Sequence, residues 1–527
     1  MLKGRPKVVV VTGLRPDKVV EVAITINEEV RHACFTTPSD KSQWKIAMVS
    51  CNNHKLMART GLWERLAKVC HEVDAIIHMG DQVYADEDFR RVQTGDTMDD
   101  TEKGMESAWV QAKKLLSTRD ENGLLQEVPV EEWSRHRTKM VDYYRRCYRS
   151  TWNHPAVAAV LASCSNYMIL DDHEIVDNLG DLAEHRDHAS KDFFVAQAGY
   201  QAYKEYQEQL YHDVDFEDPT TPAFYSFSVC PSIGCFMTDN RIERSLRLPV
   251  LQDQYKPEAW KDKEFLGPAQ WERLSGGLAD DGEFSSNQVL LLVTPTPAIF
   301  LGSHATHSAA KIVGDAVGTW GNLPFEIEQK DLVTQLSGWQ GKKRNRAAII
   351  LGGDIHVGGF SQARLIKQKG CILNEVTSSA IGNYPTRDIG GMKAVLVEGI
   401  LKADAKLDFS FDVEHHDWIF GPNMGFLDIM LGEEGAPPHI TGTLIDESGT
   451  AHIRNFKLGQ ASAPGIDAKD VDVSVEKDIQ EAWPRESPKH QDRTANPAAE
   501  AAFRTGEMIG QTHDHKKNCA GCTCTVS

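Results

Sequence analysis

The sequence predicts an α/β (α+β) fold in which helices pack on strands that run largely in parallel, and three observations support this class. Short apolar runs of strand length alternate with helical patterns from residue 44 onward. Five of these runs end in a residue of metal-ligand type. The chain has 527 residues, of which 41% are hydrophobic and 25% charged, so it can bury a sizeable globular core.

The amino-terminal part predicts a small β element. Residues 8–36 alternate β-branched runs with the turn sequences GLRPD and NEE, which is typical of an antiparallel hairpin or meander. So few strands cannot form a large hydrophobic core of their own, and we expect them to pack against the main domain. We therefore divide the chain into a short β element (1–42), a main domain (43–460) and a tail (461–527). The tail has little periodicity and is rich in Pro, Ala, Ser and charged residues, which predicts that it is mostly disordered.

The main domain begins with a predicted strand–helix–strand unit. The strands are KIAMVS (45–50) and AIIHMG (75–80), and between them Leu62, Leu66 and Val69 recur at helical spacing. This pattern is typical of a crossover helix packed on a parallel sheet. A long polar and helical stretch follows at about residues 85–165, and its acidic, weakly apolar portion predicts an insertion or lid.

The rest of the main domain contains further strands and one long helix. Strand-length apolar runs occur at 166–170, 234–238, 288–294 and 346–353, and alternating patterns follow at 406–414 and 439–458, with a hairpin turn at 446–449. Residues 190–211 repeat aromatic side chains at helical intervals. We expect this helix to turn its aromatic stripe toward the core, with ligand stacking as the alternative.

Polar residues follow the apolar runs at the points where the strands are expected to end. They are Cys51, Asp81, the run Asp171-Asp172-His173-Glu174, Asp239, and Asp354 with His356. In α/β sheets the carboxyl ends of the strands form the ligand crevice, so these side chains are expected to meet there. A single Asp in this position is equally well explained as a helix cap or turn residue. The whole set predicts bound metal ions, because clustered negative charges are costly unless cations neutralise them.

Composition excludes several classes of protein. The formal net charge is −19 and no dense Lys/Arg block is present, which argues against nucleic acid as a stable partner. The early VVVV run is too short for a secretory signal, and no segment is long and apolar enough to span a bilayer. Eleven cysteines are an odd number for a disulfide framework. These features together predict a cytoplasmic protein in a reducing compartment.

Five motifs carry a resemblance to a known family. They are SCNN (50–53), HMGDQVYAD (78–86), LDDHEIVDN (170–178), TDNR (238–241) and LGGDIHVGG (351–359). In this order they resemble the alkaline phosphatase D (PhoD-like) branch of the calcineurin-like metallophosphoesterases. The resemblance covers about residues 15–460 and implies a four-layer αββα sandwich of two mixed sheets, with a metal cluster at the carboxyl ends of the strands. The first 42 residues resemble only the last strands of the fibronectin-like domain that often precedes this fold.

The resemblance implies roles for the first three candidate ligands. Asp81 corresponds to the carboxylate that bridges two ions, Cys51 to a thiolate ligand and Tyr84 to a phenolate ligand. Thiolate and phenolate donors favour a trivalent transition ion, so iron is expected. Without the resemblance, Cys51 would be interpreted as a buried thiol and Tyr84 as a core ring.

The other candidate roles follow from the later motifs. Asp172 replaces the amide ligand that is usual in the superfamily, and its extra charge suits calcium. Asp354 and His356 fall on the final histidine-rich motif and are assigned as ligands. His173 is expected beside the substrate phosphate, as the acid for the leaving group or as an orienting donor. For Arg241, substrate binding and bracing of the sheet remain open.

The predicted function is that of a metal-dependent phosphoesterase, of the phosphodiesterase or alkaline phosphatase type, acting on a small phosphate ester. Iron with calcium is the expected ion pair, other divalent ions being possible, and a hydroxide held between the ions is the expected nucleophile. The alternatives are a catalytically silent scaffold or a metal-binding module of the same fold, tethered to a membrane or partner through its tail. The presence of every ligand position favours the enzyme.

The carboxyl terminus carries a lipidation pattern. The last four residues, CTVS, fit the C-a-a-X pattern with Cys524 as the prenylated residue, and a neighbouring cysteine could take the second acyl chain that stable anchoring requires. This interpretation predicts peripheral association with the cytoplasmic side of a membrane. Chance occurrence of the pattern and metal binding by the cysteine cluster are the alternatives.

Overall fold

The computed structural model describes twelve segments of the chain. Together they contain two large β-sheets and the helices that cover them. The described residues are 6–16, 18–26, 29–37, 41–88, 106–216, 221–246, 263–299, 318–365, 371–385, 411–433, 435–458 and 522–525. The acidic portion of the predicted lid and most of the predicted disordered tail lie outside these residues.

The larger sheet has seven strands in the order β14-β12-β13-β11-β10-β9-β8. Their bounds are Tyr225–Cys230 (β8), Ile233–Met237 (β9), Val289–Thr294 (β10), Ala347–Gly352 (β11), Gly358–Leu365 (β12), Ile372–Thr377 (β13) and Phe411–Ile419 (β14). Strands β9, β10, β11 and β13 are parallel, whereas β8, β12 and β14 add antiparallel edges. The central parallel strands therefore end at one edge of the sheet.

The second sheet has six strands in the order β17-β16-β15-β3-β4-β7. Their bounds are Gln43–Val49 (β3), Ala75–His78 (β4), Ser165–Met168 (β7), Asn423–Met430 (β15), His439–Asp446 (β16) and Ala451–Asn455 (β17). Strands β3, β4 and β7 are parallel to one another, and β15 to β17 form an antiparallel half. The predicted crossover unit is thus confirmed at the centre of this sheet.

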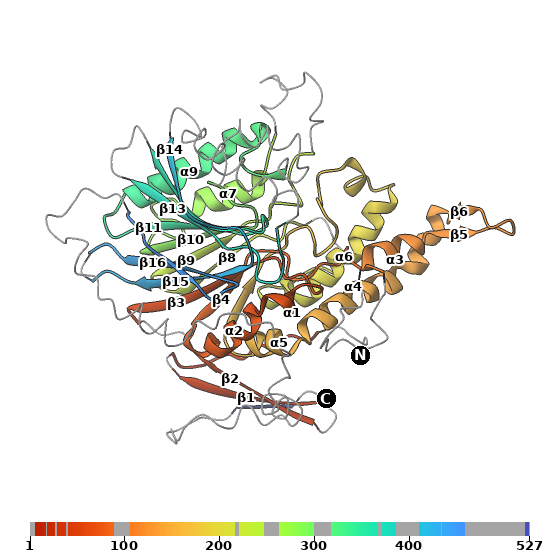
Figure 1. Cartoon of the computed structure of the whole chain (residues 1–527), viewed down its shortest axis with the longest axis horizontal. Helices are drawn as coiled ribbons and strands as arrows, with labels where there is room; N and C mark the ends of the chain where they lie inside the picture. The colour runs from red at the N-terminus through yellow and green to blue at the C-terminus, as the bar shows by residue number, and fades with distance from the viewer. Residues whose placement is uncertain are drawn as a thin grey trace.

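The two sheets pack face to face, and the alternation of side chains along each strand makes the layers. In β10, Leu291 faces the core between the sheets while Leu290 and Leu292 pack with α7 (Pro268–Gly277) and α9 (Glu326–Gly341). In β3, Ile46 faces the same inner core while Ala47 packs with the helices on the opposite side. Those helices are α1 (Met57–Thr60), α2 (Leu62–Val69) and α5 (Pro155–Leu161). The result is the expected four-layer αββα sandwich of two mixed sheets (Figure 1).

A group of helices lies beside the sandwich. It contains α3 (Ala108–Lys114), α4 (Arg137–Trp152) and α6 (Lys191–Tyr206), and a short hairpin of β5 (Ser117–Arg119) and β6 (Leu125–Glu127) projects from it (Figure 1). The side chains of Ser107 and Ser190 cap the first turns of α3 and α6. The aromatic stripe of α6 is buried, as predicted. The short 3-10 helices are Cys70–Glu72 (η1), Val130–His136 (η2), Ala183–His185 (η3), Glu208–Leu210 (η4) and Leu323–Phe325 (η7).

The amino-terminal strands form the predicted antiparallel hairpin. Its strands are β1 (Val19–Ile26) and β2 (Glu29–Thr36), and β18 (Cys522–Thr525), the one described piece of the tail, pairs in parallel with β1. The VVVV run at residues 8–11 forms no strand and is largely exposed. Among the described helices, none is both long and apolar enough to cross a membrane.

Candidate metal centre

The predicted ligands lie together because parallel strands of both sheets end at the same place. Cys51 and Asp81 follow β3 and β4, and Asp172 follows β7, all in the six-stranded sheet. Asp354 and His356 follow β11 of the seven-stranded sheet. The centre is therefore built from the carboxyl edges of two sheets that face each other.

Asp81 occupies the middle of this centre. Three groups of side chains offer ligand atoms that all lie within 4.8 Å of one another, and Asp81 belongs to each group. The groups are Cys51–Asp81–His356, Asp81–Asp172–His173 and Asp81–Asp171–Asp172–Asp354. A carboxylate shared in this way has the position required to bridge two ions.

The backbone conformation also singles out four of the predicted ligands. Six non-glycine residues in the described segments have positive φ, and four of them are predicted ligands. These four are Cys51 (φ 55°), Asp81 (59°), Asp354 (64°) and His356 (55°). Side chains disfavour this conformation, and such strain persists chiefly at functional sites, where the surrounding structure holds it. Turns that would normally contain glycine therefore carry donor side chains here.

Tyr84 links the two sheets at the centre. It is buried, and its hydroxyl lies 3.1 Å from Asp81 Oδ2 and 3.0 Å from His356 Nε2. Burial, together with the nearby charges of Asp81 and Cys51, raises the pKa of Tyr84 well above its usual range. A phenol in this position needs a cation beside it to become a phenolate.

Cys51 lies in an equally protected position. Its Sγ atom is 3.0 Å from Ser379 Oγ and accepts a hydrogen bond from Ser50 Oγ at 3.3 Å. Burial and the charge of Asp81 raise the pKa of the Cys51 thiol. Cys51 and Tyr84 are thus in the same electrostatic situation, since both would ionise only against a bound cation.

His173 is placed by a carboxylate and by an aromatic ring. Its Nδ1 atom lies 2.9 Å from Asp86 Oδ1, and its ring stacks on Tyr84 with 4.1 Å between centroids. Burial lowers its pKa, but the carboxylates of Asp86, Asp172 and Asp81 outweigh burial and raise the pKa well above 6.5. The side chain keeps 17% of its surface exposed. An imidazole with one nitrogen bonded to Asp86 and partial exposure is suited to proton donation at the rim of the centre.

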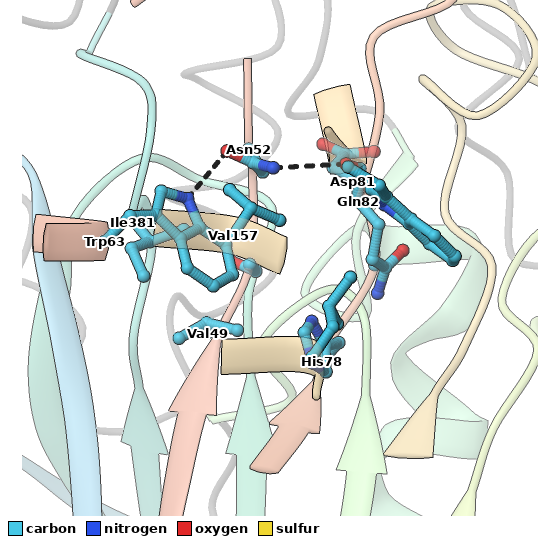
Figure 2. A pocket seen from close by; sticks show the side chains of 12 residues that line it. Val49, Asn52, Trp63, His78, Asp81, Gln82, Val157 and Ile381 are labelled. Carbon is cyan, nitrogen blue, oxygen red and sulfur yellow. Dashed lines mark hydrogen bonds between the residues drawn. The ribbon is translucent and has the colours of Figure 1, made fainter. Parts of the chain in front are cut away.

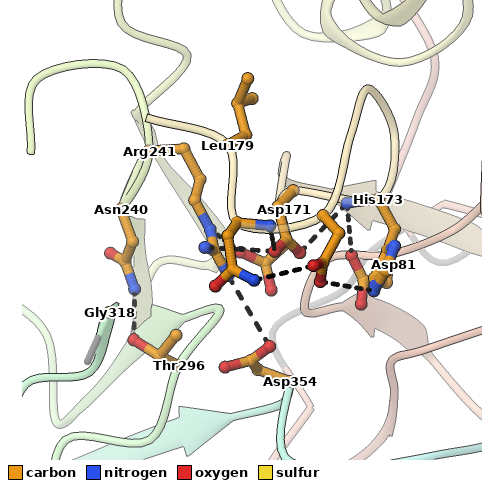
Figure 3. A network of polar contacts seen from close by, with 12 residues as sticks. Asp81, Asp171, His173, Leu179, Asn240, Arg241, Thr296, Gly318 and Asp354 are labelled. Carbon is orange, nitrogen blue, oxygen red and sulfur yellow. Dashed lines mark hydrogen bonds and ion pairs between the residues drawn. The ribbon is translucent and has the colours of Figure 1, made fainter. Parts of the chain in front are cut away.

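Arg241 is the buried cation of the centre (Figure 3). It follows β9, is 3% exposed, and its guanidinium pairs with Asp171, with Asp172 at 3.3 Å and with Asp354 at 3.7 Å. Burial opposes the charge of Asp172, but Arg241 and His173 lower its pKa to about 2. Burial and the charge of Asp172 raise the pKa of Asp171 to about 6, against the influence of Arg241.

Asp239 does not join the cluster, although it also follows a strand. Its carboxylate accepts backbone hydrogen bonds from Ala223, Arg241 and Ile242 at 2.8 to 3.0 Å. It is therefore a turn residue that fixes the backbone of Arg241. For Asp239, the simple capping interpretation is the right one.

Glu174 holds the two acidic turns against each other. Its carboxylate accepts hydrogen bonds from the backbone N–H groups of Asp81, Gln82 and Asp171 at 2.6 to 3.2 Å. Burial raises its pKa to about 7, although the hydrogen bonds favour ionisation. Glu174 is thus a scaffold for the ligand-bearing turns.

A small cavity lies behind the centre, between the ends of β3 and β4 and the outer helices (Figure 2). It measures about 10 Å³, the room for one water molecule. Asn52 crosses its edge, accepting a hydrogen bond from Trp63 Nε1 at 2.8 Å and donating to the backbone oxygen of Gln82 at 3.4 Å. These contacts tie the turn after Cys51 to the turn after Asp81.

The donor set fits metal ions. A thiol, a phenol, an imidazole and several carboxylates converge, and Asp171 Oδ2 is buried without a hydrogen-bond partner. Sulfur, phenolate and nitrogen donors suit a transition ion, whereas the carboxylate-rich side suits a hard ion such as calcium.

The structure brings the six predicted ligands and His173 together, and it shows contacts of several supporting residues to which the sequence assigned no role. These are Asp86, Asp171, Glu174, Ser379 and Asn383, whose side-chain amide lies 3.2 Å from His356 Nε2. Asp86, Asp171 and Glu174 are part of the quoted motifs, so motif membership was the available signal. Ser379 and Asn383 lie in the segment VTSSAIGN, whose contact with β3 becomes apparent only in the fold.

Three comparisons place the chain among known proteins. A family model described as PhoD-like phosphatase matches residues 46–409. No curated protein is significantly similar to the chain. A solved structure titled "Structure of PhoD" is 13% identical with a TM-score of 0.51, covering 87% of this chain and 80% of its own. At this identity, the likeness shows the fold alone.

Two further solved structures are similar at lower scores. The purple acid phosphatase PPD1 from yellow lupin (Lupinus luteus) is 10% identical with a TM-score of 0.42, covering 83% of this chain and 60% of its own. GAP50, described as the anchor in the inner membrane complex of Plasmodium, is 9% identical with a TM-score of 0.33, covering 86% and 100%. At these scores neither carries an argument about this chain.

Proposed function

Because the chain belongs to the PhoD-like phosphatase family, we propose that it is a metal-dependent hydrolase of small phosphate esters. The observation that carries this proposal is the sharing of Asp81 by three groups of potential ligands, directly beside the partly exposed imidazole of His173. This arrangement places a cation-binding centre and a proton donor on the same side of one small site.

Two ions are proposed to occupy the centre. Cys51, Tyr84 and His356, with Asp81, would hold the first, for which iron is the best match to the donors. Asp81, Asp172 and Asp354 would hold the second, for which calcium is the best match. When bound, such ions polarise phosphoryl oxygens and lower the pKa of water.

His173 is proposed to protonate the departing alkoxide of the substrate. Asp86 bonds to Nδ1, whereas Nε2 lies 3.8 Å from the exposed carboxylate of Asp177, and the stack on Tyr84 limits rotation of the ring. Nε2 is the nitrogen proposed to carry the proton to the leaving group. His173 also lies within reach of Asp81 and Asp172 as a potential ligand. We favour the acid role because Asp86 already fixes one nitrogen and the ring reaches the surface of the site.

The proposed substrate is small and the proposed location is cytoplasmic. The net charge of −19 repels phosphate polymers, so a single mono- or diester suits the protein better than a nucleic acid. We further propose that Cys524 in the terminal CTVS is prenylated and tethers the protein to the cytoplasmic face of a membrane. A mass increase at Cys524 in a eukaryotic host tests this tether, and an unmodified Cys524 would contradict it.

Hydrolysis and metal content together test the proposed function. Purified protein is assayed with p-nitrophenyl phosphate and bis-p-nitrophenyl phosphate, and its metals are measured before and after chelation. We expect hydrolysis that chelation abolishes, and near-complete loss in Asp81→Asn but not in Asp120→Asn, a turn residue of the β5–β6 hairpin that projects from the molecule (Figure 1). Bound metal without hydrolysis would indicate a metal-binding module, and neither property would indicate a scaffold.

A further inference from the structure

Two carboxylates flank the imidazole of His173. On one side Asp86 Oδ1 lies 2.9 Å from Nδ1, and on the other side Asp177 Oδ1 lies 3.8 Å from Nε2. Their surroundings differ, because the side chain of Asp86 is 10% exposed whereas that of Asp177 is 58% exposed. Asp86 and the stack on Tyr84 already orient the ring, so the carboxylate at Nε2 is not needed for that purpose.

Hydrogen bonds hold the carboxylate of Asp177 at the rim of the centre. The backbone N–H of Asp177 donates to Asp86 Oδ2 at 2.7 Å, and the side-chain amide of Asn178 donates to Asp177 Oδ2 at 2.8 Å. Asn178 has a positive φ of 57°, a conformation that Asn tolerates, and its own N–H donates to Asp172 Oδ2 at 2.7 Å. The turn that follows His173 therefore brings an exposed negative charge to a defined place beside Nε2.

The leaving group of a substrate would lie next to this carboxylate. A proton donor must come within about 3.2 Å of the oxygen that it protonates. With His173 Nε2 as the donor, and Asp177 Oδ1 3.8 Å from it, the departing oxygen would lie within about 7 Å of Asp177. Charges act on each other over this distance, because the screening length is about 10 Å at about 0.1 M salt. Asp177 therefore acts on any charge that the leaving group carries close to its oxygen.

We propose that Asp177 selects substrates by the charge of their leaving group. Esters whose leaving alcohol carries an ammonium group are favoured, whereas esters whose leaving alcohol carries a carboxylate or a second phosphate are disfavoured. This inference rests on the proposed phosphoesterase function and names the class of ester that suits the site. Asp177 is a specificity-determining residue, because its charge acts on the leaving group.

The experiment compares two alkyl phosphates with opposite leaving-group charge, ethanolamine phosphate and phosphoglycolate. The measured quantity is the ratio of kcat/KM for ethanolamine phosphate to kcat/KM for phosphoglycolate, in metal-loaded protein at low salt. Asp177→Asn removes the charge and should lower this ratio about 10-fold relative to the wild type. Asp177→Lys inverts the charge and should lower the ratio further. The intrinsic reactivity of each ester cancels, because the same two esters are compared in every protein.

The matched control is Asp280→Asn, which also removes one exposed carboxylate and should leave the ratio unchanged. Asp280 pairs with Lys342, which lies between the end of α9 and the start of β11, at the edge of the sheet opposite to the centre. Salt provides a second control, because the ratio in the wild type should fall as salt screens the exposed Asp177 and should change little in Asp177→Asn. A substitution that acted only through His173 would slow both esters in proportion and leave the ratio unchanged.

Two results would overturn the inference. One is an equal ratio in the wild type and in the Asp177 variants. The other is a wild-type ratio that does not respond to salt, which needs no variant and holds even if the variants fail to fold. Absence of hydrolysis would contradict the proposed function, and calorimetric binding of the same two esters then decides the role of Asp177. A wild type that binds both esters equally, or neither of them, overturns the inference.

Discussion

The ring of Tyr84 stacks on the imidazole of His173 with 4.1 Å between centroids, at an interplanar angle of 22°. The same tyrosine directs its hydroxyl to Asp81 and His356. One side chain therefore joins the proposed ion-binding groups to the proposed proton donor. The hydroxyl of Tyr84 contacts Asp81 and His356, whereas its ring contacts His173. A substitution can therefore remove the first contact and keep the second.

Substitutions at Tyr84 should separate these two contributions. Tyr84→Phe keeps the ring and removes the phenolate donor, so we expect lower iron retention after desalting with His173 still oriented. Tyr84→Leu removes both contacts and should lose iron and, in addition, weaken the hydrolysis of esters with poor leaving groups. Iron content and rates with aryl and alkyl phosphates measure the two effects. Equal behaviour of the two variants in both assays would contradict the separation.

Replacement of Asp86 should affect proton donation. In Asp86→Asn the carboxylate that bonds to His173 Nδ1 becomes an amide, and we expect kcat to fall about 10- to 100-fold for alkyl phosphates. The loss should be smaller for p-nitrophenyl phosphate, because p-nitrophenolate departs without much protonation. Glu87→Gln is the control, since this neighbouring carboxylate pairs with Lys55 and has no bond to His173. An equal loss for both substrates would argue against the acid role.

Gly80 should tolerate no side chain. It has φ +93°, and an added Cβ would overlap the Cβ of Asp171, next to the proposed ligand Asp81. Gly61 has φ +64° with no atom within 4 Å of an added Cβ. The variant Gly61→Ala therefore measures only the free-energy cost of the positive φ, without a steric clash. We expect Gly61→Ala to lower the free energy of unfolding by about 1–2 kcal/mol. Gly80→Ala should cost about 1–3 kcal/mol more and reduce metal retention. If denaturant unfolding shows the same decrease in the free energy of unfolding for Gly61→Ala and Gly80→Ala, this expectation is contradicted.

Because His78 is buried, we expect the folded protein to lose stability in acid. It is buried at the end of β4, and burial lowers its pKa from 6.5 to about 4, although a hydrogen bond with Asn166 opposes this shift. The unfolded chain takes up the proton below pH 6.5 and the folded chain only near pH 4, so stability falls as the pH drops through this window. The contribution reaches about 3 kcal/mol at pH 4.

Denaturant unfolding between pH 7 and 4 measures this contribution. His78→Gln should flatten the pH dependence of the free energy of unfolding relative to the wild type. His71→Gln is the control, because the His71 side chain is 72% exposed. Parallel curves for His78→Gln and the wild type would show that His78 does not supply the dependence.

Much of the fold follows from patterns in the chain. The parallel strands β3, β4, β10 and β11 are apolar runs that end in polar residues, and the sequence predicted each of them. The edge strand β8 and the strands β12, β13 and β15 were not predicted. Their sequences mix polar residues and glycine, and pairing with neighbouring strands, rather than local preference, makes them strands.

The sequence names candidate residues for the site, but it does not show which of them contact one another. Donor types at strand ends identify Cys51, Asp81 and Asp354. The pairing of Arg241 with Asp171 depends on how one sheet lies against the other, and a linear pattern contains no information on that distance. For the same reason, Asp239 and Asp171 look alike in sequence, although one caps a turn and the other enters the cluster.

The contribution of both sheets to one centre has a consequence for biosynthesis. Cys51 and Asp81 leave the ribosome long before Asp354 and His356, which are more than 270 residues further along the chain. A nascent chain therefore holds an incomplete set of donors until β11 has emerged and docked. We therefore expect the proposed ions to be loaded late in maturation, and a fragment that stops before β11 to retain less metal than the whole chain.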